Sequence, residues 1–291
     1  MKLTVDANQK VHTPNPHYCF FGAGSAAEAF VKGMLDNNIT TPQHVAMINR
    51  NSEARLGYLR EKYGVSASNH DEIKAKWLHE ADVIILAMKP KDAIEACKEL
   101  RPLLHNKSLI VSIIAGLSIS TIQQILGETP VVRTMPNTSS TIGLGATGVC
   151  YSAETTIEQR FIAEQMLKAI GIVAEVEESL LDAVTGVSGS GPAYVYYLME
   201  AMIEAAAHEG LSMQQAHELV IQTVRGAAEM VRLTGESPAV LRQKVTSPGG
   251  TTQAALNVLN ERGVKEAVKE AIVQARARAA EMGEQIGREL R

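Results

Sequence analysis

The strongest constraint on the fold of this chain is an alternation of short apolar runs with amphipathic stretches. Short strand-like runs, most of them apolar, occur at Tyr18–Phe21, Val45–Ile48, Val83–Met88, Leu109–Ile114 and Val131–Met135. Segments with helical spacing, such as Ala26–Leu35 and Ser52–Tyr63, lie between them, and a helix and a strand follow at Ile157–Ile170 and Ile172–Val176. Strands that alternate with helices predict the α/β class, with a parallel, doubly wound sheet.

The pattern changes after about Ser179. From there, apolar residues recur only at helical spacing, over Ala193–His208, Met213–Thr234, Thr252–Asn260 and Val264–Met282. This periodicity predicts an all-helical region. A chain of 291 residues is long enough for about two domains, which we place at residues 17–178 and 179–291.

The overall composition excludes several classes of partner. The net charge is −4 and the Lys and Arg residues are scattered, so neither nucleic acid nor a membrane is expected as a partner. No apolar run approaches the roughly 20 residues of a membrane span, and the first 16 residues, read as a loose extension, lack the apolar core of a signal peptide. Three scattered cysteines and eight dispersed histidines predict a cytoplasmic protein without a metal site.

A glycine motif follows the first apolar run and precedes the first helix. Its residues are Gly22, Ala23, Gly24, Ser25, Ala26 and Ala27. The spacing fits GxGxxG/A, in which the first glycine allows a tight turn and the second lets the backbone approach a pyrophosphate at a helix N-terminus. Because the motif sits between a strand and a helix, it predicts a Rossmann-like dinucleotide site. A purely structural glycine turn is the alternative.

The end of the second apolar run bears on the choice of cofactor. It reads Asn49-Arg50-Asn51-Ser52, without the Asp or Glu that would accept hydrogen bonds from a ribose 2′-hydroxyl, and Glu53 lies beyond it. Arg50 could pair with a 2′-phosphate instead. We therefore expect NADPH, with NADH also usable. The alternative is that Arg50 is a solvated loop residue.

Three further stretches carry a family signature. They are residues 184–194 (VTGVSGSGPAY), 247–252 (SPGGTT) and 87–90 (AMKP). Together with the glycine motif, Ala115-Gly116 and residues 133–138 (RTMPNT), they resemble the pyrroline-5-carboxylate reductases over about residues 18–282. The resemblance implies a Rossmann-like NAD(P)-binding domain followed by a helical domain that dimerises, and dimers of this family often build larger rings.

The resemblance also implies an activity and a set of site residues. The activity is reduction of the cyclic imine 1-pyrroline-5-carboxylate to L-proline by NAD(P)H, the last step of proline biosynthesis. Besides the glycine motif and Arg50, the implied cofactor residues are Asn49, Asn69, Ala87, Met88, Lys89, Pro90, Ile114, Ala115 and Gly116. The implied substrate residues are Glu178, Ser247, Gly249, Gly250, Thr251 and Thr252, of which Thr252 is the catalytic candidate.

The turn at residues 247–252 also suits an anion on physical grounds. Pro248 can stiffen it, its glycines let the backbone approach a ligand, and two threonines precede the helical segment Gln253–Leu259. Unpaired N–H groups at such a helix start favour a carboxylate, and a threonine hydroxyl could reach a ring nitrogen. The alternative is an ordinary threonine N-cap after a glycine turn.

Two rival functions differ in their residues. A β-hydroxyacid dehydrogenase would carry a lysine on the long helix after the sheet domain, but residues 192–200 contain none. Alcohol oxidation also needs a base, and none is evident. Lys89 is placed to shape the cofactor loop rather than to act as an acid, because Pro90 follows it. The second rival, a nucleotide-sensing relative without catalysis, would need the same glycine motif.

Overall fold

The computed structural model describes residues 15–50, 52–105 and 108–288. Most of the expected N-terminal extension and Asn51 fall outside these ranges. Contacts group the described residues up to Thr185, together with those from Arg278 onward, into one unit and Gly186–Ala277 into a second. The expected domain limits, 17–178 and 179–291, differ from the bounds of these units and stay a prediction.

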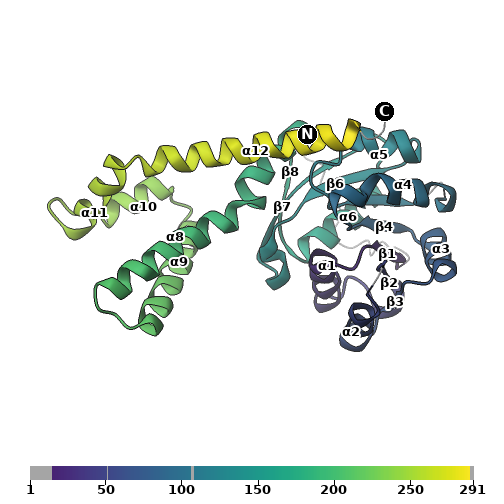
Figure 1. Cartoon of the computed structure of the whole chain (residues 1–291), viewed down its shortest axis with the longest axis horizontal. Coiled ribbons are helices and arrows are strands. Elements are labelled where there is room, and N and C mark those ends of the chain that lie inside the picture. The colour runs from purple at the N-terminus through teal and green to yellow at the C-terminus, as the bar shows by residue number, and fades with distance from the viewer. Residues whose placement is uncertain (1–14, 51, 106–107, 289–291) are drawn as a thin grey trace, which may run out of the picture. The chain divides into compact units, whose positions relative to one another are not determined.

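The first unit contains an eight-stranded sheet (Figure 1). Its strands are β1 (Tyr18–Phe21), β2 (Val45–Ile48), β3 (Ser66–Ser68), β4 (Val83–Leu86), β5 (Leu109–Ser112), β6 (Val131–Met135), β7 (Gly145–Tyr151) and β8 (Gly171–Glu175). Their order in space is β3-β2-β1-β4-β5-β6-β7-β8. The chain therefore runs outward in one direction from β1 to β3 and in the other from β4, so the order reverses between β1 and β4.

The doubly wound sheet is confirmed, with one correction. The expectation of an all-parallel sheet is wrong at β7, which pairs antiparallel with β6, whereas β8 pairs parallel with β7. Residues 136–144 connect β6 to β7, and a parallel crossover needs a dozen residues or more. The sequence analysis also missed β3 and β7, since neither carries an unbroken apolar run.

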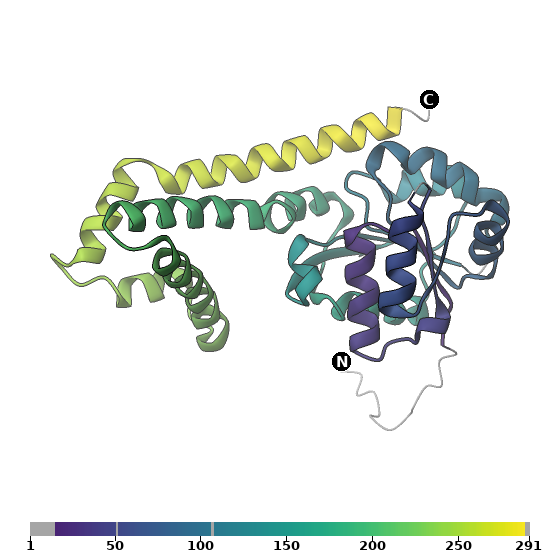
Figure 2. The same ribbon diagram turned by 60° about the horizontal axis from the view of Figure 1, so that its bottom comes forward.

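Helices cover both faces of this sheet (Figure 2). One hydrophobic core lies beneath α1 (Ser25–Asp36), α2 (Glu53–Tyr63) and α6 (Ile157–Lys168). The other lies beneath α3 (Asp71–Glu80), α4 (Ala93–Leu100), α5 (Ile119–Leu126) and the end of the last helix. Strand β1 shows the division: Phe20 belongs to the first core and Cys19 to the second, because successive strand residues point to opposite faces.

Short helical segments connect these elements. They are η1 (Pro42–His44), η2 (Pro90–Asp92), η3 (Arg101–Leu103), η4 (Thr138–Ile142), η5 (Glu178–Leu180), α7 (Leu181–Val184) and η6 (Thr185–Gly189), the last with π-helical hydrogen bonding. All three cysteines lie in the first unit, buried and without a disulfide. Burial raises the pKa of the Cys19 thiol to about 12, so Cys19 packs as a small apolar residue.

The second unit is helical, as predicted. It holds α8 (Gly191–His208), α9 (Met213–Thr234), α10 (Pro238–Lys244), α11 (Thr251–Glu261) and the first part of α12 (Val264–Arg288). Helix α9 begins at a capping box of Ser212 and Gln215 and ends at Gly235 in the left-handed region. The sequence analysis missed α10, a seven-residue helix. None of the described helices is both long and apolar enough to cross a membrane.

The second unit buries little of its apolar surface. Its buried hydrophobic residues are Ala216 and Val220, both on α9, and α8 contributes none. Along α8 the large side chains of Tyr196, Tyr197 and Leu198 are exposed. A surface of this kind marks an interaction site in a soluble protein.

Candidate cofactor and substrate sites

A pocket of about 640 Å³ lies at the carboxyl ends of β1, β2, β3 and β4 in the first unit. It includes the point where the strand order reverses, which is where ligands bind in doubly wound sheets. The predicted cofactor residues that line it are Gly22, Ala23, Gly24, Asn49, Arg50, Asn69, Ala87, Met88 and Lys89. Four separate segments of the sequence thus meet at one place.

The two glycines of the motif have different constraints. Gly22 has φ of 119°, and a Cβ there would collide with the carbonyl of Ala87, so this position requires glycine. Gly24 is the N-cap of α1, with ordinary φ and open space where a Cβ would project. Because Gly24 supplies no side-chain cap to α1, the first turn of that helix is suited to accept an external anion.

Cations outnumber carboxylates among the charged residues of the pocket lining. Four cations, Arg50, Lys74, Lys89 and Lys91, face two carboxylates, Asp71 and Asp92. Arg50 lies 3.7 Å from Asp92 and 4.0 Å from Glu99, and its side chain is 60% exposed. An excess of positive charge suits a cofactor with an additional phosphate. Asp71 is the first residue of α3, and Asp92 is the last residue of η2.

A polar cluster lies behind the glycine turn, between α1 and α2. Arg55 donates from Nε to the Ala23 carbonyl at 2.9 Å and from Nη2 to the Gly24 carbonyl at 3.4 Å, and Nη2 lies 2.7 Å from Glu28 Oε2. Burial by itself would raise the pKa of Glu28, but hydrogen bonds from Tyr63, Arg55 and Lys62 outweigh it and lower that pKa to about 2. Glu28 is therefore a carboxylate with both oxygens engaged.

The remaining predicted cofactor residues lie close to these segments in the chain. Ser25, Ala26 and Ala27 form the first turn of α1, and Pro90 opens η2 directly after Lys89. Ile114, Ala115 and Gly116 follow β5, where Ile114 is buried and its N–H donates to Ser112 Oγ at 3.3 Å. A Cβ on Gly116 would lie 3.0 Å from the backbone nitrogen of Gly283 on α12. Their contact with a cofactor stays a prediction.

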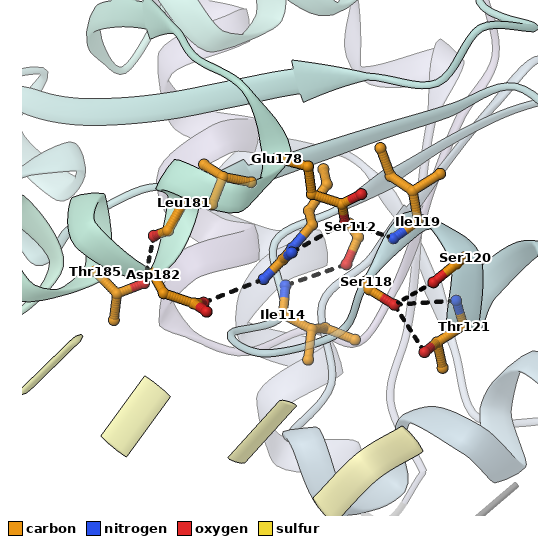
Figure 3. A network of polar contacts seen from close by, with 11 residues as sticks. Ser112, Ile114, Ser118, Ile119, Ser120, Thr121, Glu178, Leu181, Asp182 and Thr185 are labelled. Atoms are coloured by element: carbon orange, nitrogen blue, oxygen red, sulfur yellow. Dashed lines mark hydrogen bonds and ion pairs between the residues drawn. The ribbon is translucent and has the colours of Figure 1, made fainter. Parts of the chain in front are cut away.

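Glu178, a predicted substrate residue, belongs to an ion-pair network in the first unit (Figure 3). Its Oε1 accepts from Arg133 Nη1 at 3.0 Å and from the N–H of Ile119, the first residue of α5, at 2.8 Å. Arg133, which is nearly buried on β6, also lies 3.6 Å from Asp182 on α7. One cation thus faces two carboxylates, and Glu178 ties η5 to β6 and α5.

The predicted substrate turn lies in the second unit, between α10 and α11. Gly249 has φ of 73°, and Gly250 donates its N–H to the Ser247 carbonyl at 3.1 Å. Gly250, rather than a threonine, is the N-cap of α11 and supplies no side-chain cap. Thr251 and Thr252 occupy the first two helical positions. The alternative of an ordinary threonine N-cap is therefore wrong for this turn.

The other polar groups bear on the type of chemistry. Among the described residues, no group of three or more His, Cys, Asp or Glu side chains is arranged to hold a metal ion. Sequence reasoning missed Arg55, Lys74, Lys91, Asp71 and Asp92. Lys91 and Asp92 directly follow the 87–90 stretch and could have been included with it, whereas Arg55 reaches the turn from an adjacent helix and left no local signal.

Comparisons with known proteins agree with this arrangement. A family profile described as "Pyrroline-5-carboxylate reductase dimerisation" matches residues 178–282, and one described as "NADP oxidoreductase coenzyme F420-dependent" matches residues 17–116. Pyrroline-5-carboxylate reductase 2 of Bacillus subtilis is 43% identical over 268 residues, which cover 92% of this chain and 95% of that protein.

Two solved structures are similar along most of their length. A pyrroline-5-carboxylate reductase from Coxiella burnetii has a TM-score of 0.85 at 36% identity, covering 92% of this chain and 98% of its own. The Plasmodium falciparum pyrroline carboxylate reductase, solved with NADP bound, has a TM-score of 0.83 at 27% identity with the same coverage.

Proposed function

The chain belongs to the pyrroline-5-carboxylate reductase family, and we propose that its two units divide the reaction between cofactor and substrate. The protein reduces the cyclic imine 1-pyrroline-5-carboxylate to L-proline with NAD(P)H. The pocket of the first unit holds the dinucleotide, and the turn at residues 247–252 holds the substrate. The observation that carries this proposal is the uncapped glycine turn at the switch point of the sheet.

The first unit binds and orients the cofactor. The turn at Gly22–Ala27 presents its N–H groups to the pyrophosphate, and the cations of the pocket offset the negative charge. Of the two cofactors we propose NADPH as the preferred one, because Arg50 lies at the end of β2 with Lys74 and Lys91 in the same lining. The bound nicotinamide supplies the hydride, and the residues of the chain supply position and charge.

The second unit anchors the substrate. At the start of α11 the uncapped N–H groups and the helix dipole favour the substrate carboxylate. Thr252, half-buried at the second helical position, offers a hydroxyl for the ring nitrogen. A protonated imine already accepts hydride readily, so holding the ring in place contributes more than a strong acid would. No lysine or histidine is assigned a proton-transfer step.

Glu178 is retained in the proposal in a limited role. Its Oε1 accepts hydrogen bonds from Arg133 and from the N–H of Ile119, so Oε2 is the atom that would contact the substrate. Its main effect is then to hold the start of η5 against β6. We propose it as a residue that supports the substrate site.

The helical unit makes the protein a homo-oligomer. The exposed apolar residues of α8 are the surface that a second copy covers. We propose a homodimer, which can associate into a larger ring of dimers, and a cytoplasmic location. Sedimentation of the purified protein distinguishes a dimer from a ring by mass.

The test of the function is NADPH oxidation with 1-pyrroline-5-carboxylate as substrate, followed as the loss of the reduced nicotinamide absorbance, with proline measured as product.

Gly24→Asp places a carboxylate in open space beside the pyrophosphate and should reduce NADPH affinity by about 100-fold or more. Gly24→Ala is the matched control, since it adds a methyl group without charge. An unchanged affinity in Gly24→Asp contradicts the assignment of the turn. NADPH binding without turnover would instead favour the nucleotide-sensing alternative.

A further inference from the structure

The polar cluster behind the glycine turn has a role that the pocket lining does not reveal. We infer that Arg55 and Glu28 form a positioning pair for the cofactor: Arg55 aims the N–H of Gly24 in the turn and offsets the charge of Glu28. This inference rests on the proposed assignment of the Gly22–Ala27 turn to the pyrophosphate. Neither residue is among those that line the pocket, so both act through the turn.

Arg55 contacts two peptide groups of the glycine turn. Arg55 donates to two consecutive carbonyls, Ala23 and Gly24. No cis peptide bond occurs in the described chain, and in a trans peptide the N–H points away from the carbonyl of the same unit. The Gly24 carbonyl also accepts the N–H of Glu28 at 3.0 Å as the first helical hydrogen bond of α1, so the helix already fixes its direction. The Ala23 carbonyl is held by Arg55 at 2.9 Å, and holding it toward α2 directs the N–H of Gly24 to the opposite side, which is the side a ligand on the turn would occupy.

Arg55 also changes the local charge at the start of α1. Glu28 lies in the first turn of α1, where its carboxylate would repel a pyrophosphate bound at the same helix end. Glu28 Oε2 pairs with Arg55, and Oε1 accepts from Tyr63, Tyr58 and Lys62 at 2.7, 3.1 and 3.1 Å. Two cations thus surround one carboxylate. This local excess of positive charge replaces a repulsion with a weak attraction.

The same contacts make the pair rigid. The Arg55 and Glu28 side chains are only 25% and 19% exposed, so water screens their interaction incompletely. Arg55 is anchored at three points: the two carbonyls and the carboxylate. A planar guanidinium can make these contacts together, whereas a lysine ammonium cannot match all of them in one geometry.

The experiment is a comparison of NADPH dissociation constants in the full-length protein, measured by titration of NADPH fluorescence. Arg55→Met removes the hydrogen bonds and the cation, and it should weaken NADPH binding by about tenfold. Arg55→Lys keeps the cation and should give an intermediate affinity. In Arg55→Met/Glu28→Gln the uncompensated carboxylate is also gone but the hydrogen bonds of Arg55 are still missing, so the affinity should recover only in part, to a value between Arg55→Met and wild type. Lys168→Met, which removes an exposed ion pair with Glu164 on α6, is the control and should bind as wild type.

These dissociation constants test the Arg55–Glu28 pair. If Arg55→Met binds NADPH as tightly as Lys168→Met, or if the double variant binds no better than Arg55→Met, the inference is wrong. If Arg55→Met is too unstable to titrate, the double variant and Arg55→Lys are compared with wild type instead. The NADPH dissociation constant of each should be within about tenfold of the wild-type value. Weaker binding by either variant overturns the inference. At saturating NADPH the KM for the imine should not change, and an unfolding midpoint equal to that of wild type shows that the fold is intact. Gly24→Asp, titrated in parallel, distinguishes failure of the Arg55–Glu28 inference from failure of the proposed pyrophosphate site. Full NADPH affinity in that variant contradicts the assignment of the turn to the pyrophosphate.

Discussion

The two units of this chain differ in how much they can stabilise themselves. The first has a hydrophobic core on each face of its sheet, with side chains such as Phe20, Phe30 and Leu100 fully buried. The second has helices of up to 22 residues within it, yet its buried hydrophobic residues are one alanine and one valine. Regular secondary structure therefore does not imply a self-sufficient core. The first unit buries its core within one chain, and we propose that the second covers its apolar surface against another copy.

In the proposed function, the two binding tasks therefore fall to different physical settings. The cofactor pocket is formed by strand ends that hydrogen bonds and two cores hold in place. The substrate turn belongs to helices that expose their apolar faces. Cofactor binding should therefore withstand changes that disturb assembly, whereas turnover should not.

The largest expected effect comes from disrupting the helical surface. Tyr197 on α8 is 77% exposed, and Tyr197→Asp would place a charge in the surface that another copy covers. Burying an unpaired charge costs several kcal/mol, so we expect dissociation and a loss of activity of about 100-fold or more at micromolar concentration. Sedimentation measures the association, and NADPH titration should show nearly unchanged affinity.

A matched substitution in the first unit sharpens this comparison. Ile157 on α6 is 82% exposed, so Ile157→Asp adds the same charge at a similarly exposed apolar position outside the helical unit. Its oligomer and activity should resemble those of wild type. A fully active monomer of Tyr197→Asp would break the comparison, because the second unit would then need no partner.

The sequence predicted the fold best where local pattern and packing coincide. Strands β1, β2 and β6 match their expected bounds because each lies in the buried part of the sheet; β1 and β2 are unbroken apolar runs, and β6 begins with two valines. Strand β7, with the sequence GATGVCY, contains two glycines, and its pairing is set by the short connection from β6 and by its neighbours. Helix α9 also matches, since capping residues and periodicity agree. The lack of a core in the second unit is not visible in periodicity, which records only which face is apolar.

The candidate site was predictable to the extent that it follows the strand ends. Gly22, Asn49, Asn69 and Ala87 each come just after a strand, and parallel strands bring their carboxyl ends to one edge. Arg55 was not predictable, because its contact with Ala23 depends on how α2 packs against α1. For the same reason the sequence could not show that Arg133 and the N–H of Ile119 engage Glu178.

The second-largest effect should come from the substrate turn. Thr252→Ala removes a hydroxyl but keeps the N–H groups of α11, and it should lower kcat/KM for the imine by about 5- to 150-fold, or about 1–3 kcal/mol. Gly250→Val should be worse, since its Cβ would lie 2.5 Å from Ser247 Oγ. NADPH affinity should stay unchanged in both, because the pocket belongs to the first unit.

Thr246→Ala is the control for this turn. The Thr246 hydroxyl donates to the carbonyl of Arg242 at 2.6 Å, so its loss should leave kcat/KM within about threefold. If Thr252→Ala keeps wild-type kcat/KM, or loses only NADPH affinity, then the second unit does not supply the substrate contact.

A smaller effect is expected in acid, and it concerns the first unit. The pKa of Glu28 is lowered from its ordinary 4.5 to about 2, so the folded state favours the carboxylate. Its stabilising effect is fully present above about pH 4.5 and is lost as the pH falls towards 2. After allowance for solvent screening we expect about 1–2 kcal/mol. Denaturant unfolding of wild type and Glu28→Gln should differ by this amount at pH 7 and converge near pH 2.

Glu164→Gln, on an exposed helix, gives the comparison for this measurement. Its ion pair with Lys168 is solvent-exposed, so the free energy of unfolding at pH 7 should change by less than about 0.5 kcal/mol. A Glu28→Gln difference that is the same at pH 7 and pH 2 would show that the Glu28 carboxylate does not contribute in this way.

The smallest effect concerns the preference between cofactors. Arg50 is 60% exposed and already lies near Asp92 and Glu99. Its attraction for a 2′-phosphate is therefore weakened by water and by these two carboxylates. We expect wild type to have a higher kcat/KM with NADPH than with NADH, and Arg50→Ala to reduce the NADPH value by about fivefold, within the range of exposed ion pairs. The NADH value should change little, because that cofactor has no phosphate for Arg50 to contact. Lys74 and Lys91 remain in the pocket and should preserve part of the preference. Added salt should reduce the difference further, because screening weakens an exposed pair most. If wild type prefers NADH, or if Arg50→Ala affects both cofactors equally, then the cations of the first unit do not select the phosphate.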